Sequence, residues 1–233
     1  GLAFIQFNSL YQLYALKEQG DPALEIADSL LFIPDLMAYF LTGVKGTEYT
    51  VASTSQMIDP VTRDWADELI EAFGIPKKIL GAITPAGTVR GTLLPQIAHE
   101  CGVGEVPVIA VAGHDTASAV AAVPAFEDDF AYLSSGTWSL LGAELTAPLT
   151  DKSVMEANYT NEGGICGTIR LLKNIMGLWI IQECKREWDR RGEEYAFSEL
   201  VEMAEKAPAF KAVLNVDDAS FLAPGDMPAR VQE

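Results

Sequence analysis

Two short polar segments carry the residue types in this chain that are best suited to chemistry. An apolar strand expected over 106–112 ends at Gly113, His114 and Asp115, and a second over 130–135 runs into the Ser-Ser-Gly-Thr turn 134–137. The first segment offers a carboxylate that can accept a proton, and the second offers hydroxyls and backbone N–H donors that can bind an anion. Together they suit the transfer of a phosphoryl group to an alcohol.

The Asp115 carboxylate has two interpretations that are compatible with each other. As a general base it would take the proton of a sugar hydroxyl while that oxygen attacks phosphorus, and His114 would hydrogen-bond another hydroxyl of the same sugar. Alternatively, Asp115 only caps the small-residue helix expected over 115–123, because an aspartate is favoured at the start of a helix.

The turn 134–137 also has two interpretations. Its hydroxyls and Gly136 would let a ligand approach the backbone closely, as in an anion-binding nest. Alternatively, it is a plain turn that joins strands expected over 130–135 and 138–145 into a hairpin.

A long helix expected over 173–190 places two amides near each other. Asn174 and Gln182 are eight positions apart, which is about 80° around a helix of 3.6 residues per turn. They either line one side of a cleft together or are solvated amides. The residues expected to face the core from this helix are Met176, Ile180, Cys184 and Trp188.

Helix and strand patterns alternate over most of the chain, which predicts an α/β fold with a mainly parallel sheet. Helices are expected from Ser9 to Gly20, from Pro22, over 34–43, over 65–73 with Asp64 as its cap, and over 95–101, 115–123, 173–190 and 198–206. Strands are expected as a hairpin or a strand pair within 83–95, and over 106–112, 130–135, 138–145 and 164–170. The acidic loop 124–129 is the expected domain boundary.

The composition restricts the classes of partner. The chain has 233 residues, 49% of them hydrophobic, and a net charge of −17. The hydrophobic fraction suffices for a core, while the negative charge disfavours nucleic acid and anionic membranes as partners. A nucleotide would be repelled at long range, so a phosphate site must act locally through backbone N–H groups and a metal ion. The acidic surface is otherwise typical of a soluble protein.

Cysteine and histidine usage points to a reducing setting without a histidine-rich metal site. Cys101, Cys166 and Cys184 are odd in number and widely spaced, which favours reduced thiols and a cytoplasmic location. The two histidines, His99 and His114, are too few for a histidine-rich zinc site, and the sequence indicates no metal-ligating residues. No apolar run is long enough to span a membrane. The chain starts without methionine, which leads us to expect a fragment of a longer protein.

Several segments together resemble the FGGY carbohydrate kinase family, and within it the rhamnulokinases. They spread over nearly the whole chain in the family's order, and the GHDTASAV, SSGTWSL and NEGG…LLKNIMGLW runs are the most specific. The segments are PDLMAYFLTG (34–43), TEYTVASTSQMID (47–59), VAGHDTASAVAAVP (111–124), YLSSGTWSLLG (132–142), NYTNEGGICGTIRLLKNIMGLW (158–179) and FLAPGD (221–226).

The resemblance implies an ATP-dependent kinase that converts L-rhamnulose to L-rhamnulose 1-phosphate in L-rhamnose catabolism. Asp115 matches the family's general base, which would deprotonate the C1 hydroxyl and also contact the sugar. His114 and Thr116 are implied beside the sugar, and Asn174 matches an asparagine that contacts the ligand. On the nucleotide side, Thr137 matches the position that meets the phosphates.

Gln182 matches a further residue on the nucleotide side of the family's cleft. The implied fold is a two-domain, actin-like ATPase of ribonuclease H-like architecture, present only in part. Residues 1–124 would be the later part of the N-terminal, sugar-binding domain, and 125–233 the early part of the C-terminal, nucleotide-binding domain. The sugar and ATP with Mg²⁺ would meet between them. The sequence does not specify an oligomeric state.

Two family segments have no counterpart here: the D-x-G-x-[ST] phosphate loop and the glycine-rich motif that cradles the adenosine. We therefore expect that this chain alone does not turn over. The rival hypotheses are a kinase for another ketose, such as L-fuculose, and a non-catalytic actin-like sugar-binding protein. A serine hydrolase built on His114, Asp115 and Ser118 lacks the G-x-S-x-G motif.

Overall fold

The computed structural model describes residues 4–127 and 129–233, so Asp128, in the loop expected as a domain boundary, lies outside the described residues. The chain forms two compact units. The first consists of Gly1–Tyr132 and Gly142–Lys173, and the second of Leu133–Leu141 and Asn174–Glu233. Within the described residues, no helix is both long enough and apolar enough to cross a membrane.

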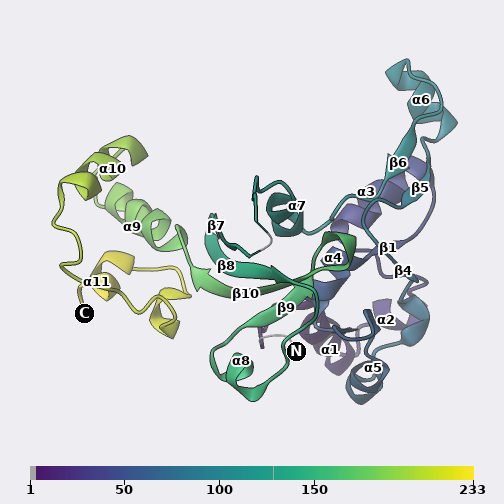
Figure 1. The fold of residues 1–233 in the computed structure, drawn as a ribbon, viewed down its shortest axis with the longest axis horizontal. Coiled ribbons are helices and arrows are strands. Elements are labelled where there is room, and N and C mark those ends of the chain that lie inside the picture. The colour runs from purple at the N-terminus through teal and green to yellow at the C-terminus, as the bar shows by residue number, and fades with distance from the viewer. Residues whose placement is uncertain (1–3, 128) are drawn as a thin grey trace. The chain divides into compact units, whose positions relative to one another are not determined.

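Short helices and short strands alternate in the first unit (Figure 1). Its elements are α1 (Ser9–Glu18), α2 (Ala23–Ile26), α3 (Ile33–Thr42), β1 (Thr47–Glu48), α4 (Tyr49–Ala52), β2 (Ile58–Asp59), β3 (Asp64–Trp65), α5 (Asp67–Phe73), β4 (Ile83–Thr84), β5 (Val89–Thr92), α6 (Pro95–Cys101), β6 (Pro107–Ile109), α7 (Asp115–Ala121), α8 (Lys152–Glu156) and β9 (Thr160–Gly163).

The strands β7 (Ala131–Ser135), β8 (Trp138–Leu145) and β10 (Ile169–Met176) contribute residues to both units. The helices of the second unit are α9 (Trp179–Arg190), α10 (Phe197–Lys206) and α11 (Met227–Gln232). Its core combines buried residues from β10, α9, α11 and the segment before α11, namely Met176, Cys184, Phe221 and Met227, with Ile180 and Trp188 packed against them. The expectation that the four apolar residues from Met176 to Trp188 face one core is confirmed.

The main core of the first unit lies among its helices. Apolar side chains of α1, α2 and α5 and of the segments that flank α5 are almost fully buried together, namely Leu10, Leu13, Leu24, Met57, Ile70, Ile75 and Ile79. The helix α3 lies beside β5 and β6 (Figure 1), and it ends at Gly43, whose φ of 71° is the left-handed conformation that glycine adopts without strain. These contacts place α3 and β6 next to the segment that leads to Gly113.

The prediction of a mainly parallel sheet is wrong. The four-stranded sheet has the order β7-β8-β10-β9, and β9 pairs with β10 antiparallel. The pairs β2–β3 and β5–β6 are also antiparallel, and β1–β4 is parallel. The α/β class itself is confirmed, because alternation of helix and strand along the sequence does not specify strand direction when the connections are short.

Two local predictions in the first unit are wrong for the same reason. Asp64 does not cap a helix, because Asp64 and Trp65 pair with Asp59 and Ile58 as a strand, and α5 begins at Asp67. The segment 83–95 is not a hairpin, since β4 pairs with β1 and β5 pairs with β6. In each case pairing with a strand elsewhere in the chain overrides the local pattern.

The helix predicted over 173–190 begins only at Trp179, and the preceding residues from Ile169 are strand β10. The segment 164–170, predicted as one strand, instead follows β9 and contains a short 3-10 turn at Ile165–Gly167 and the start of β10. The residues up to Met176 form a strand of the four-stranded sheet, and the backbone N–H groups of Gly177 and Trp179 both donate to the Thr137 carbonyl oxygen at 3.2 Å, where the helix begins. Asn174 is therefore on a strand, and its helical proximity to Gln182 is wrong.

Candidate functional site

Backbone hydrogen bonds hold the turn that carries His114 and Asp115 in the first unit. The N–H of Gly113 donates to Glu48 Oε2 at 2.9 Å, and the N–H of His114 donates to Thr50 Oγ1 at 3.2 Å. A Cβ atom on Gly113 would lie 3.2 Å from the same Glu48 oxygen and 3.3 Å from Pro34 Cβ. A side chain at this position would therefore press on Glu48 and Pro34, and glycine lets this turn approach Glu48 closely without that displacement.

Glu48 connects this turn to the start of α4. Its carboxylate is 1% exposed and accepts hydrogen bonds from the Thr50 N–H at 2.9 Å, the Thr50 hydroxyl at 2.6 Å and the Val51 N–H at 3.2 Å. Together with the bond from Gly113, these donors satisfy a buried carboxylate, as burial requires. Glu48 thus fixes the position of α4 and of the Gly113–Asp115 turn at once.

A buried ion pair lies behind Glu48. Arg90 Nη2 donates to Asp35 Oδ1 at 2.8 Å, and both side chains are at most 4% exposed. The Asp35 carboxylate also accepts the Glu48 N–H at 3.1 Å. Burial raises the pKa of Asp35, and the Glu48 N–H and the Arg90 charge act against that rise. Contacts thus run from Arg90 through Asp35 and Glu48 to the His114 turn.

The His114 imidazole lies among three charged groups. Its Nδ1 is 2.9 Å from Arg170 Nη2 and 3.3 Å from Glu162 Oε2, and its Nε2 is 3.6 Å from Asp115 Oδ1. Burial is the main cause that lowers the pKa of His114, and the Arg170 charge lowers it further, while Glu162, Asp115 and Glu48 oppose this. The lowered pKa favours a neutral imidazole at neutral pH.

Asp115 presents its carboxylate to solvent, with the side chain 97% exposed. Its Oδ1 accepts the N–H of Thr116 at 2.6 Å and the Thr116 hydroxyl at 3.3 Å. The residue at the cap position of α7 is His114, so the interpretation of Asp115 as the helix cap is wrong. An exposed carboxylate beside a buried threonine can take a proton from a ligand that approaches from solvent.

Two residues of this group were missed in the sequence. Glu162 on β9 lies directly opposite Arg170 on β10 in the antiparallel register, and Arg170 Nη2 donates to Glu162 Oε2 at 3.0 Å. Arg170 is fully buried, and its Nε donates to the Gly163 carbonyl oxygen at 3.0 Å. An arginine within the apolar run 169–172 was the available signal, because a buried charge requires a partner.

The other predicted residues belong to the second unit. Thr137 is exposed, and its carbonyl oxygen accepts the N–H groups of Gly177 and Trp179, both at 3.2 Å. Asn174 is on β10 and Gln182 is on α9, and both are half-buried. The structure thus brings His114, Asp115 and Thr116 together within the first unit, while Thr137, Asn174 and Gln182 lie within the second.

The turn 134–137 is clamped by the segment that follows β10. The Gly136 carbonyl oxygen accepts the Leu178 N–H at 2.9 Å, and the Gly136 N–H donates to the Trp138 carbonyl oxygen at 2.8 Å. A Cβ atom on Gly177 would lie 2.6 Å from the Gly136 oxygen and 2.6 Å from Ser139 Oγ. Gly177, which the sequence analysis did not single out, therefore permits this close packing.

The residues present fit a phosphate group better than a metal ion. Among residues 4–127 and 129–233, no group of three or more His, Cys, Asp or Glu side chains could hold a metal. In contrast, the exposed Thr137 hydroxyl, with Ser134 and Ser135 in the same turn, offers hydroxyl donors of the kind that contact phosphate oxygens.

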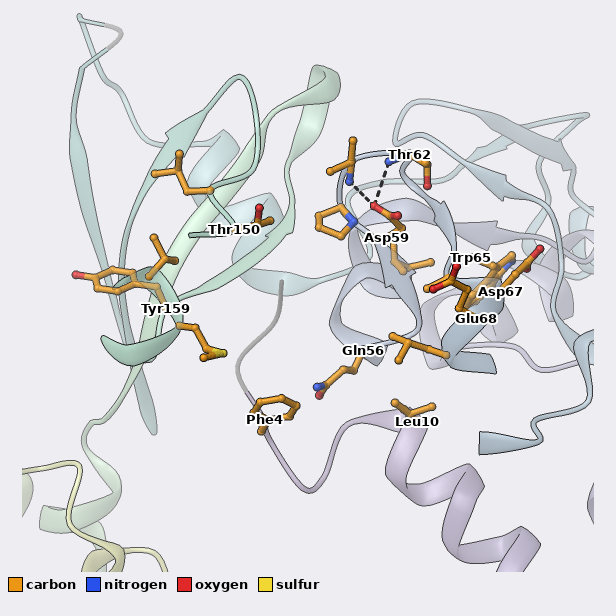
Figure 2. A pocket seen from close by; sticks show the side chains of 18 of the residues that line it. Phe4, Leu10, Gln56, Asp59, Thr62, Trp65, Asp67, Glu68, Thr150 and Tyr159 are labelled. Carbon is orange, nitrogen blue, oxygen red and sulfur yellow. Dashed lines mark hydrogen bonds between the residues drawn. The ribbon is translucent and has the colours of Figure 1, made fainter. Parts of the chain in front are cut away.

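A separate pocket of about 730 Å³ lies in the first unit (Figure 2). Figure 2 shows Phe4, Leu10 and Trp65 on one side of it and Tyr159 on the other. Its lining includes neither His114 nor the residues described around it, namely Asp115, Thr116, Glu162 and Arg170. The Asp59 carboxylate in its wall accepts the backbone N–H groups of residues 61 and 62, at 2.7 and 3.3 Å.

Comparison with known proteins places this arrangement in a family. Residues 1–122 match the N-terminal domain model of the FGGY family of carbohydrate kinases, and residues 131–232 match its C-terminal domain model. The chain is 46% identical over its full length to a rhamnulokinase of Bacteroides thetaiotaomicron and 44% identical, also over its full length, to one of Halalkalibacterium halodurans. It spans 47% and 48% of these two proteins, about half their length.

Solved structures agree on the fold. A xylulose kinase from Lactobacillus acidophilus superposes with a TM-score of 0.74 at 21% identity, covering 90% of this chain and 42% of that one. A Plasmodium falciparum glycerol kinase with ADP gives 0.67 at 17% identity, covering 93% and 45%. The chain therefore has part of the actin-like fold, and it belongs to the FGGY family of carbohydrate kinases.

Proposed function

We propose that the whole protein transfers the terminal phosphoryl group of ATP to O1 of L-rhamnulose, which yields ADP and L-rhamnulose 1-phosphate. The observation that carries the proposal is the exposed carboxylate of Asp115 beside His114, whose pKa is lowered chiefly by burial, in a chain 40–46% identical to several curated rhamnulokinases. The names of those relatives identify the proposed substrate, and Asp115 provides a carboxylate that could accept the proton of the sugar hydroxyl.

In this proposal Asp115 accepts the proton of the C1 hydroxyl as the sugar oxygen bonds to phosphorus. The bond between that phosphorus and the oxygen bridging to ADP breaks at the same time. His114 and Thr116 lie next to Asp115 and would contact the sugar, as would Asn174. Closure around the bound sugar would exclude water and favour transfer over hydrolysis of ATP.

On the nucleotide side, we propose that the Thr137 hydroxyl contacts the ATP phosphates and that Gln182 contacts the nucleotide. The clamped turn 134–137 supports this, because its geometry is held before a ligand arrives. A kinase of this family would use Mg²⁺ with ATP to neutralise phosphate charge. No protein ligand is assigned to that ion.

The same proposal assigns residues 1–124 to the sugar-binding domain and 125–233 to the nucleotide-binding domain. The two family models support a division of this kind, since one ends at residue 122 and the other begins at residue 131. A cytoplasmic location is also proposed, and the three free cysteines support a reducing setting.

The test is an ADP-release assay on the whole protein with L-rhamnulose, L-fuculose, D-xylulose and glycerol at equal concentrations. A clear preference for L-rhamnulose in kcat/KM is the expected result. A preference for L-fuculose would overturn the proposed substrate and leave the proposed reaction, phosphoryl transfer to a sugar, in place. Saturable sugar binding without ADP release would favour a sugar-binding protein instead.

A further inference from the structure

We propose that Arg170 is a positioning residue that holds His114 as the neutral Nε2–H tautomer, with that proton on the side of the imidazole that faces Asp115. The role of this arrangement in turnover rests on the proposed kinase function. The arrangement itself rests on the contacts of Arg170, Glu162 and His114.

The hydrogen bonds of Arg170 Nη2 determine the tautomer. Its Nη2 carries two hydrogens and has two partners, Glu162 Oε2 at 3.0 Å and His114 Nδ1 at 2.9 Å. A guanidinium group only donates hydrogen bonds, so His114 Nδ1 must offer its lone pair. The remaining ring proton is therefore on Nε2, the nitrogen 3.6 Å from Asp115 Oδ1.

The opposite tautomer conflicts with the same contacts. A proton on Nδ1 could point to Glu162 Oε2 at 3.3 Å, but it would then face a hydrogen of Arg170 Nη2 at the shorter distance of 2.9 Å. An imidazolium adds a second cost, because its charge would lie against the Arg170 charge. Among the groups around the ring, Glu162, Asp115 and Glu48 favour the charged form, and burial together with Arg170 favours the neutral one.

Arg170 is held too firmly to move away from the ring. Its side chain is fully buried, its Nε bonds to the Gly163 carbonyl oxygen, and Glu162 lies opposite it on β9. The N–H of Gly163 donates in turn to Ser53 Oγ at 2.7 Å. The donor that faces Nδ1 is thus built into the β9–β10 pair.

The neutral tautomer matters for Asp115 because of charge. An imidazolium beside Asp115 would stabilise its carboxylate form and make it a weaker base. A neutral ring still offers an N–H to an oxygen of the sugar or of Asp115, and it does not weaken the base in this way. Arg170 therefore keeps a donor next to the base without a positive charge on it.

The first test is ¹⁵N NMR of the 233-residue chain with labelled histidine. The chain has two histidines, and the exposed His99 serves as an internal reference that a His99→Gln variant assigns. At pH 7 we expect an unprotonated Nδ1 and a protonated Nε2 for His114. A protonated Nδ1, or an imidazolium at that pH, would overturn the proposal. Because this measurement uses the unmodified chain, a variant that fails to fold does not remove the test.

The second test uses two variants with opposite expected effects. Arg170→Gln removes the cation and should raise the pKa of His114 toward or above its ordinary value of about 6.5. Glu162→Gln removes the anion and should lower it. Arg170→Lys, which keeps the cation but not the guanidinium, should fall between Arg170→Gln and the unmodified chain. Loss of packing alone would not shift the pKa in opposite directions, and shifts of the same sign would contradict the proposal.

The control variant is Arg63→Gln, which removes an arginine that bonds to the Gly167 carbonyl oxygen and does not contact His114. It should leave the His114 titration unchanged.

The third test measures kcat/KM for the sugar against pH in the whole protein. In Arg170→Gln the low-pH side of the kcat/KM profile should move to higher pH. A shift of about one pH unit lowers kcat/KM about tenfold at pH values on the acid side of the profile. In Glu162→Gln the low-pH side should move to lower pH, and an unmoved profile in both variants would overturn the role in turnover. If the unmodified protein shows the expected tautomer but phosphorylates no sugar, the proposed function fails and the tautomer stands.

Discussion

Asp115 and His114 are adjacent in the chain and have opposite environments. The Asp115 side chain is almost wholly exposed, while the His114 side chain is 23% exposed and contacts a buried arginine. The exposed group is free to meet a ligand, and the buried group is held in one orientation. This division suits a base that must reach a substrate and a neighbour that must not move.

At Asp115 we predict that Asp115→Asn abolishes most turnover in the whole protein and spares sugar binding. The amide keeps an oxygen that can accept the Thr116 N–H but cannot take a proton, so a loss of about 10²–10⁴-fold in kcat is expected. Steady-state kinetics and calorimetric sugar binding measure the two effects. Asp151→Asn, an exposed carboxylate without a side-chain cap bond, is the control. Unchanged kcat in Asp115→Asn would exclude it as the base.

The buried pair of Arg90 and Asp35 gives a prediction about stability. Arg90→Leu should lower the free energy of unfolding by about 3–5 kcal/mol, because it leaves the Asp35 carboxylate buried without its cation. Asp35→Asn combined with Arg90→Leu should cost less than the sum of the two single changes, since no unpaired charge remains. Urea unfolding of the four proteins measures the coupling, and strict additivity would contradict it.

Among the elements, the β9–β10 pair and the turn between β7 and β8 do the most to position functional groups. The β9–β10 pair holds Arg170 opposite Glu162 in register, and a slip of one strand by one residue would point the two side chains to opposite faces of the sheet. In the second unit, the turn before β8 packs against the segment that joins β10 to α9. The positions of these side chains thus depend on strand pairing rather than on helices.

Gly177 tests the packing of that turn. Gly177→Ala would bring a methyl group within 2.6–2.8 Å of the Gly136 oxygen and of Ser139, so overpacking should cost about 1–3 kcal/mol of stability. The affinity of the whole protein for ATP should fall as well, because the displaced turn carries Thr137. Gly104→Ala, where a Cβ atom has no neighbour within 4 Å, is the control. Equal effects of the two changes on stability and ATP affinity would argue against a clamped turn.

On the scale of the whole molecule, the chain combines two compact units, an acidic composition and about half the length of its curated relatives. A net charge of −17 gives no long-range attraction for ATP. The proposed nucleotide binding would therefore depend on short-range donors such as those of the turn 134–137. A nucleotide site of that kind depends on the positions of individual groups more than on total charge.

We predict that the 233-residue chain alone releases no ADP above background with L-rhamnulose, although the whole protein does. The reason is that the chain spans only 47% of its rhamnulokinase relative, and the proposed reaction should need the part of the whole protein that lies outside this span. The coupled ADP-release assay compares the two proteins at equal concentration. Robust turnover by the chain alone would contradict this prediction.

Features that depend on neighbouring residues in the chain could be predicted from the sequence. The Gly113–Asp115 segment, the α/β class and the helix over 95–101 were predicted from local patterns. The kinase family followed from several motifs in order. Strand direction, the start of α9 and the pairing of Asp64 were predicted wrongly, because each depends on a partner strand or a carbonyl group outside the segment itself.

By itself, the sequence determined the chemical types available, the family and the carboxylate at Asp115, because these depend on residue identity and local spacing. Only the tertiary structure decided that Arg170, eight residues after Glu162 and 56 after His114, contacts both of them. It also decided that Glu48 binds the Gly113 N–H across 65 positions. Buried charges find partners through strand register and chain packing, and neither is encoded in the spacing of one segment.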